Sequence, residues 1–436
     1  LSNVKITARA GYMNSRERVT LALNHREPDR VPLDLGGSPT SGMHVSTVYA
    51  LRQALKLDPP GTPVKVIEPY QMLGEIAPDL CDALGVDVVG LSSSTTMFGF
   101  KNEGWKPWKL PDGTPILVPS GFNTESDEDG SVFLYPQGDS TVRPSGHMPK
   151  DGFYFDAVNR QEEIDWKALD PRENLEEFAP ISNEELEYLR HEAEKLDAHT
   201  DKAVLANFGG TSFGDIALVP GLQLRHPKGV RGVKEWYMCH LRRPDYILRV
   251  FEAQCKIAVQ NLERIHQAVG DLIAAIFVSG TDFGTQKRPI MSNASYRRLY
   301  KPFHKRINDW VHGNTEWKTF IHSCGSIDSL IEEFVEAGFD ILNPVQTSAA
   351  DMDPSKLKAK YGDEIVFWGG GVDTQRTLPF GTPEDVRKEV HERIRLFAAN
   401  GGFVFNTIHN VQPKVPVENV LAMYETVHEY GSYPIR

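Results

Sequence analysis

A regular alternation of short apolar runs and helix-like segments dominates this sequence of 436 residues. The runs are rich in Val, Ile, Leu and Phe, which is typical of parallel strands buried on both faces. The segments between them carry the spacing and the end signals of helices. Eight strands are expected near residues 31, 87, 203, 272, 319, 340, 365 and 402. Eight strand–helix units predict an α/β fold of the (β/α)8 TIM-barrel type.

The helical segments are delimited by N-capping residues, glycines and prolines. Ser15 is expected to cap the first helix, and Pro302 is expected to kink a helix over 293–312. The predicted helices cover about 15–25, 46–57, 72–84, 182–196, most of 213–243, 244–269, 293–312, 326–337, 354–360, 382–399 and 417–430.

From about residue 97 to 165 the alternation stops. Gly, Pro, Asp and aromatic residues replace it, with turn signals at 111–113 and 127–130. This pattern predicts antiparallel β-hairpins inserted into the larger fold. A lid, a dimer surface and a merely decorative insertion are all open. The expected organisation is a leader or expression remnant over 1–13 and a single barrel domain over 14–436, with the inserted antiparallel β region at about 97–165.

Composition excludes several classes of partner. The net charge of −12 argues against nucleic acid or an anionic membrane as the main partner. No apolar run approaches the roughly 18 residues of a membrane span, and the first residues lack the apolar core of a secretory signal. The four cysteines are too few for a disulfide framework in so long a chain. A cytoplasmic protein with a small-molecule substrate is expected.

The strand near residue 319 ends in a group of potential metal ligands. Thr319-Phe320-Ile321 is followed at once by His322, Ser323, Cys324 and Gly325. A strand places residues i and i+2 on the same face, so an imidazole and a thiolate would point the same way. An isolated His-x-Cys pair is more often a chance match than a metal site.

A third potential ligand follows the last predicted strand. His409 lies in Thr407-Ile408-His409-Asn410. In (β/α)8 barrels the active site is built at the carboxyl ends of the strands, where His409 and the His322 segment are expected to converge. Two histidines and one cysteine leave a fourth position open, as in catalytic zinc sites. The other cysteines, on helical segments, are expected to be small buried apolar residues.

Other polar residues end or follow the predicted strands. Taken singly, each is better explained as a loop or cap residue, but their placement on one rim favours an active site. They are Asp34, Asn207, Asp282, Asn343, Gln346, Asp373 and Asn410. Gly369-Gly370-Gly371 is only superficially similar to a phosphate loop, because no clear helix start follows it.

Five stretches carry a family resemblance: residues 16–19 (Arg-Glu-Arg-Val), 28–32 (Pro-Asp-Arg-Val-Pro), 321–325 (Ile-His-Ser-Cys-Gly), 340–346 and 367–373. Through them the chain resembles the uroporphyrinogen decarboxylase superfamily, and within it the zinc-dependent cobalamin methyltransferase branch. The resemblance covers nearly the whole chain except the insertion. It implies a TIM barrel, a zinc ion held by a His-x-Cys pair and a late cysteine, and transfer of a methyl group to a corrinoid.

Two departures from the family pattern matter. The arginine-rich motif that binds substrate carboxylates in the decarboxylases is missing after Pro32, where Asp34-Leu35-Gly36-Gly37 stands. The late cysteine position is occupied by His409. Zinc with one thiolate and two imidazoles keeps one positive charge and is the stronger Lewis acid toward oxygen. An oxygen-bearing, O-methyl substrate is therefore expected, with its methyl group passing to a corrinoid on a separate partner protein.

The roles expected from this scheme are these. His322, Cys324 and His409 bind Zn²⁺, Asp282 and more weakly Asp34 act as proton donor or orienting carboxylate, and Asn207, Asn343, Gln346 and Asn410 bind substrate. Three alternatives are open: a corrinoid-independent C–O lyase or hydrolase, a cofactor-independent decarboxylase, and a non-enzymatic protein that binds a metal or a corrinoid protein. A homodimer is also open.

Overall fold

A parallel sheet of seven strands forms the centre of the molecule, in a computed structural model that describes residues 13–435. Each strand lies beside the next one of the set along the chain, in the order β15-β14-β13-β12-β11-β10-β3. The strands are β3 (Val88–Ser92), β10 (Ala203–Asn207), β11 (Ala275–Ser279), β12 (Lys318–His322), β13 (Ile341–Asn343), β14 (Val366–Trp368) and β15 (Phe403–Val404). The expected α/β class is confirmed.

The strand expected near residue 31 is present only as two single bridges. Leu33 forms a parallel bridge with Phe405, next to β15, and Asp34 forms one with Val88 of β3. This segment thus touches both edge strands of the sheet. Pro32 has no N–H to donate, and Gly36 with Gly37 ends the extended run, so no longer ladder forms. The predicted eight-stranded barrel is therefore represented by seven strands and this bridging segment.

Side chains of the parallel strands alternate between two cores. One core contains residues from all seven strands and three residues of α1 (Ser15–Leu23): Val19, Ala22, Leu23, Val88, Ala203, Leu205, Ala275, Phe277, Phe320, Ile341, Val366, Trp368 and Val404. The intervening residues, such as Ile276, Ile321 and Leu342, pack with the surrounding helices. This two-sided burial explains the continuous apolar runs in the sequence.

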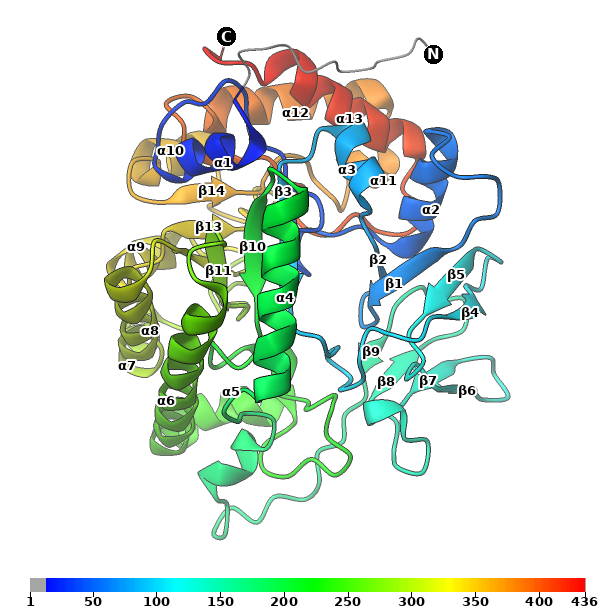
Figure 1. Cartoon of the computed structure of the whole chain (residues 1–436). Helices are drawn as coiled ribbons and strands as arrows, with labels where there is room; N and C mark the ends of the chain where they lie inside the picture. The colour runs from blue at the N-terminus through cyan, green and yellow to red at the C-terminus, as the bar shows by residue number, and fades with distance from the viewer. Residues whose placement is uncertain (1–12, 436) are drawn as a thin grey trace.

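Helices cover the outer side of the parallel strands (Figure 1). They are α2 (Val45–Ala54), α3 (Pro78–Leu84), α4 (Asn183–His199), α5 (Val233–Arg242), α6 (Pro244–Val269), α7 (Asn293–Leu299), α8 (Lys301–Asn314), α9 (Asp328–Glu336), α10 (Pro354–Tyr361), α11 (Thr377–Phe380), α12 (Pro383–Phe397) and α13 (Val417–Tyr430). No helix within residues 13–435 combines the length and the apolar character needed to cross a membrane.

Several predicted helix limits need correction. Asn14, not Ser15, caps α1, with Glu17 completing a capping box. Between 213 and 232 the structure has only the short 3₁₀ helix η3 (Ile216–Leu218), because glycines and prolines interrupt that segment. The helix expected over 293–312 is divided at Tyr300 into α7 and α8, with Pro302 in the first turn of α8. The helix expected over 72–84 begins only at Pro78, because the short strand β2 (Leu73–Gly74) occupies the start of that segment.

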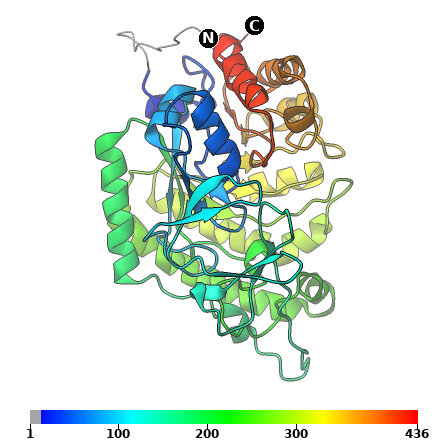
Figure 2. The same cartoon turned by 90° about the vertical axis from the view of Figure 1, so that its right-hand side faces the viewer.

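Two small sheets lie beside the parallel sheet. One has the order β2-β1-β5-β4 and includes a parallel pair, β1 with β5; the other, β6-β7-β8-β9, is antiparallel. Their strands are β1 (Val64–Glu68), β2 (Leu73–Gly74), β4 (Lys106–Lys109), β5 (Pro115–Val118), β6 (Thr124–Ser126), β7 (Val132–Leu134), β8 (Gly146–Met148) and β9 (Asp156–Ala157). Figure 2 shows the cyan strands of these two sheets in front of the rest of the molecule. β1 was not predicted from the sequence. Residues 1–12 of the predicted leader lie outside the described residues.

Candidate metal centre

The three predicted metal ligands lie together. One ligand atom each of His322, Cys324 and His409 lies within 4.8 Å of the other two. His322 is the last residue of β12, Cys324 lies in the turn after that strand, and His409 follows β15. The expected outward turn is present, but strand geometry does not place Cys324, because β12 ends at His322. The turn nevertheless brings its Sγ to 3.4 Å from His322 Nε2.

The spacing of His322 and Cys324 is that of two ligands of a tetrahedral zinc ion. Zinc–sulfur and zinc–nitrogen bonds of about 2.3 and 2.05 Å place two ligands of one tetrahedral ion about 3.5 Å apart. The separation of 3.4 Å between Cys324 Sγ and His322 Nε2 matches that value. Burial, with the nearby Asp282 carboxylate, raises the pKa of the Cys324 thiol well above its usual value. A bound dication would oppose this shift by stabilising the thiolate.

Asn343 fixes the tautomer of His322. Residues His322 and Asn343 are paired across β12 and β13, and Nδ1 of the ring lies 2.5 Å from Asn343 Oδ1. The Asn343 amide donates through Nδ2 to the carbonyl of Trp368 at 2.8 Å, so its Oδ1 must face the imidazole. An amide oxygen only accepts, so the proton of His322 sits on Nδ1. Nε2 then keeps its lone pair for a metal.

Asp282 lies between the ligands and solvent. Its Oδ1 accepts a hydrogen bond from the backbone N–H of Cys324 at 2.7 Å and lies 3.9 Å from His322 Nε2. The side chain is 42% exposed, so a molecule at the metal ligands can reach it. The carboxylate therefore positions the Cys324 turn and stays partly exposed beside the ligands. The structure allows the predicted acid–base role but also gives Asp282 a structural one.

Asp34 is connected to the ligands only through other residues. It is 1% exposed, and it accepts hydrogen bonds from Trp368 Nε1 at 2.7 Å and from the N–H of Gly37 at 2.9 Å. Burial raises the pKa of Asp34 to about 6. The carbonyl of Trp368 also accepts a hydrogen bond from Asn343, the partner of His322. Asp34 therefore stabilises the surroundings of His322 indirectly, through Trp368. Its predicted direct role in proton transfer is therefore less well placed than that of Asp282.

The predicted substrate-binding residues differ in their surroundings. Gln346 accepts a hydrogen bond from the N–H of Gly325 at 2.7 Å, which ties the loop after β13 to the ligand turn. Asn410 is fully buried; its amide bonds to Gly42, Pro39 and Gln71 and so joins loops rather than facing a cavity. Asn207 ends β10 and is half-buried. Asn343 is committed to His322, as described above.

Two residues near the site were missed by the sequence analysis. Asp215 precedes η3, and Tyr237 lies on α5 with its hydroxyl 3.4 Å from the carbonyl oxygen of Asp282. Both belong to the segment 213–243, which was expected to be mostly helical. Interpreting Gly209, Gly210 and Gly214 as one long loop after β10 would have placed Asp215 at the strand ends.

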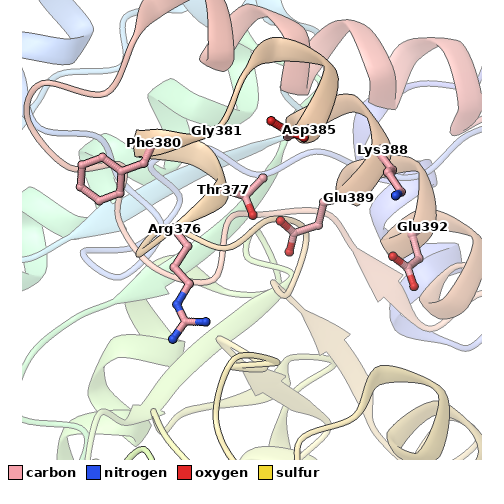
Figure 3. A pocket seen from close by; sticks show the side chains of 8 residues that line it. All are labelled: Arg376, Thr377, Phe380, Gly381, Asp385, Lys388, Glu389 and Glu392. Atoms are coloured by element: carbon pink, nitrogen blue, oxygen red, sulfur yellow. The ribbon is translucent and has the colours of Figure 1, made fainter.

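The remaining cysteines and the surface hollows lie apart from this centre. Cys81, Cys239 and Cys255 are free and buried, as expected, and burial raises the pKa of each thiol to about 11. A hollow between α11 and α12 is lined by Phe380, Glu389 and other residues of that region (Figure 3). None of the predicted site residues lines it.

Comparison with known proteins places the chain in a family. The family model described as uroporphyrinogen decarboxylase (URO-D) matches residues 170–430, which include β10 to β15 and the three candidate ligands. The chain belongs to the uroporphyrinogen decarboxylase family. The resemblance seen in the sequence is thus confirmed at the level of the family.

Individual relatives match shorter parts. Uroporphyrinogen decarboxylase of Methylococcus capsulatus is 30% identical over 101 residues, which are 23% of this chain and 27% of that protein. The enzyme of Nitrosococcus oceani is 26% identical over 227 residues, 50% of this chain and 53% of that protein. The chain thus spans between about a quarter and about half of these relatives. A solved structure, a methyltransferase from Methanosarcina mazei, has a TM-score of 0.52 at 15% identity, covering 96% of this chain and 99% of that one. It shows the same fold.

Proposed function

We propose that this protein is a zinc-dependent methyltransferase that takes the methyl group of an O-methyl compound and passes it to a corrinoid protein. The observation that carries the proposal is the group of His322, Cys324 and His409, three potential ligands beside the partly exposed Asp282 carboxylate. The fold shared with a methyltransferase supports it. A zinc ion with these ligands would supply a Lewis acid that polarises the ether oxygen of the substrate.

The residues of the chain then have distinct tasks. His322 is held in one tautomer by Asn343, and the Cys324 turn is held by Asp282 and Gln346. In the reaction the bond between the methyl carbon and the ether oxygen breaks, with its electron pair remaining on oxygen. A reduced corrinoid on the partner protein would supply the two-electron nucleophile that accepts the methyl group. In this scheme Asp282 delivers a proton to the oxygen that leaves.

Porphyrinogen decarboxylation is a weaker candidate in spite of the family name. No Arg or Lys occurs between Val31 and Leu51, where the decarboxylases carry their arginine-rich motif. Instead Asp34 receives a backbone N–H and an indole N–H inside the protein. A substrate with several carboxylates would meet no cationic side chain there.

The cytoplasmic location and the homodimer stay predictions.

Turnover of methoxylated compounds with a reduced corrinoid protein tests the proposal. Methyl transfer should require the corrinoid protein and disappear when both His322 and Cys324 are replaced by Ala. Turnover without any corrinoid would favour the C–O lyase or hydrolase instead. Methyl transfer that survives the double replacement would contradict the zinc site.

A further inference from the structure

Asp215 lies against the end of β11, close to the candidate metal centre. The hydroxyl of Thr281 donates to the carbonyl oxygen of Gly214 at 2.5 Å and ties the Asp215 loop to that strand end. A Cβ atom built on Gly280 would lie 2.5 Å from Asp215 Oδ2. The carboxylate therefore occupies the space that any other residue at 280 would fill, two residues before Asp282.

The two carboxylate oxygens of Asp215 have different surroundings. Oδ1 accepts a hydrogen bond from the N–H of Ala217 at 2.9 Å and caps η3. Within residues 13–435 no side-chain or backbone donor lies within hydrogen-bond distance of Oδ2, and Asp215 as a residue is only partly buried. A cap needs only one oxygen, so the cap does not account for the second. A carboxylate oxygen without a donor, in a partly buried residue beside the candidate metal centre, is suited to accept a hydrogen bond from a ligand.

The electrostatic surroundings connect this carboxylate to the site. The pKa of Asp215 is raised mainly by burial, with Asp282 raising it further and His322 lowering it. The pKa of Tyr237 is raised to about 12 by burial and by Asp282 and Asp215, so its phenol keeps its proton. No Lys or Arg of the described chain is among the charged groups that act on Asp215, Tyr237 or His409.

We propose that Asp215 is a specificity-determining residue whose Oδ2 accepts a hydrogen bond from a hydroxyl group of the substrate, next to the reacting methoxy group. The assignment rests on the proposed function, because it places Asp215 in the same site. A hydroxyl group satisfies the free oxygen, whereas a carboxylate at that position meets Asp215 and Asp282 and is repelled. The preferred substrates are therefore uncharged hydroxylated ethers such as ortho-methoxyphenols.

Calorimetric binding of three probes to the zinc-loaded protein tests this, without any corrinoid. The probes are 2-methoxyphenol, methoxybenzene, which lacks the hydroxyl, and 2-methoxybenzoate. The wild type should bind 2-methoxyphenol about tenfold more tightly than methoxybenzene, because one charge-assisted hydrogen bond contributes about that factor to the affinity. It should bind 2-methoxybenzoate most weakly.

Asp215→Asn keeps an oxygen for the Ala217 N–H but removes the charge. It should lower the affinity for 2-methoxyphenol about tenfold and change that for methoxybenzene by less than about twofold. Asp170 is the matched control, because it caps the short helix η2 (Pro171–Leu175) through the N–H of Arg172 in the same way. Asp170→Asn should change neither affinity.

Several results would overturn the inference. One is a wild type that does not distinguish 2-methoxyphenol from methoxybenzene. The others are an Asp215→Asn protein that binds both probes as the wild type does, and one that loses affinity for both equally. Zinc content and methyl transfer are measured on the same preparations. Selective loss of 2-methoxyphenol binding therefore supports the role of Asp215 even where methyl transfer is absent.

Discussion

At the scale of single residues, the orientation of His322 depends on Asn343. The hydrogen bond between His322 Nδ1 and Asn343 Oδ1 fixes the ring and its tautomer, and the Trp368 carbonyl fixes the amide. Replacing Asn343 by Ala should weaken zinc binding by about 10- to 100-fold, since this is the usual effect of losing such a partner. Competition with a chromogenic chelator measures the change.

A buried asparagine elsewhere provides the control. Asn419 is buried, as Asn343 is, with 1% of its surface exposed. Its side-chain amide donates to the carbonyls of Leu378 and Gly381, away from the ligands. Asn419→Ala should reduce stability without changing zinc affinity in the folded protein. Equal zinc affinity in the wild type and Asn343→Ala would show that His322 does not need its partner.

Asp34 gives a prediction about pH. Its pKa is raised from 3.8 to about 6 in the folded state, so folding favours the protonated form. Stability from this group is present below about pH 4 and is lost as the pH rises to about 6, a change of about 3 kcal/mol at most. The free energy of unfolding of the wild type relative to Asp34→Asn should therefore fall between these pH values and be constant above them. A difference that does not change with pH would contradict the assignment.

The residue types of the candidate site could be predicted, whereas their partners could not. His322, Cys324 and His409 were recognisable because each follows a predicted strand. The exposed Asp282 was recognisable for the same reason. Trp368 was visible only as an apolar strand residue, because nothing in the sequence shows that its indole reaches Asp34. Asp215 was not identified as a site residue, because it lies in a segment that was predicted to be helical.

At the scale of elements, the turn after β12 decides the position of Cys324. Gly325 has a φ of +89°, and a Cβ on it would lie 2.4 Å from the carbonyl carbon of Gly284. The turn and the loop after β11 therefore pack backbone to backbone. Strand order could be predicted from the apolar runs, but this contact depends on tertiary structure and could not.

Gly325→Ala should consequently disturb both stability and the metal centre. Backbone strain of this kind costs about 1–3 kcal/mol, and displacement of Cys324 should lower zinc content. Gly313 in α8 is the matched control, since nothing lies within 4 Å of a Cβ placed there. Gly313→Ala should raise stability by about 0.5–1 kcal/mol in thermal or urea unfolding. Full zinc content in Gly325→Ala would show that the turn tolerates the side chain.

At the scale of the whole molecule, a buried ion cluster joins the N-terminal segment to the sheet. Asp87, fully buried before β3, pairs with Arg18 and Arg30 at 2.7 Å each and accepts the N–H of Leu33 at 2.9 Å. These arginines belong to the stretches that carry the family resemblance. Their structural task is to hold the segment that bridges both edge strands.

Asp87→Asn should therefore destabilise the whole fold. Removing one partner of a buried ion pair leaves uncompensated charge and costs about 3–5 kcal/mol. Asp197, which pairs with Arg16 while 42% exposed, is the control, and Asp197→Asn should change stability by less than about 1 kcal/mol. Urea unfolding compares the three proteins. Similar stability of Asp87→Asn and Asp197→Asn would show that the cluster does not join the segment to the sheet.

The metal content of the purified protein tests the central claim most directly. Elemental analysis of the wild type and of His409→Ala, prepared in parallel, compares the same site with and without its third ligand. We expect about one zinc ion per wild-type chain and a sharp fall in the variant, because a site held by His322, Cys324 and His409 loses one of its three ligands. A wild type without metal, or a variant that keeps all its zinc, would contradict this account.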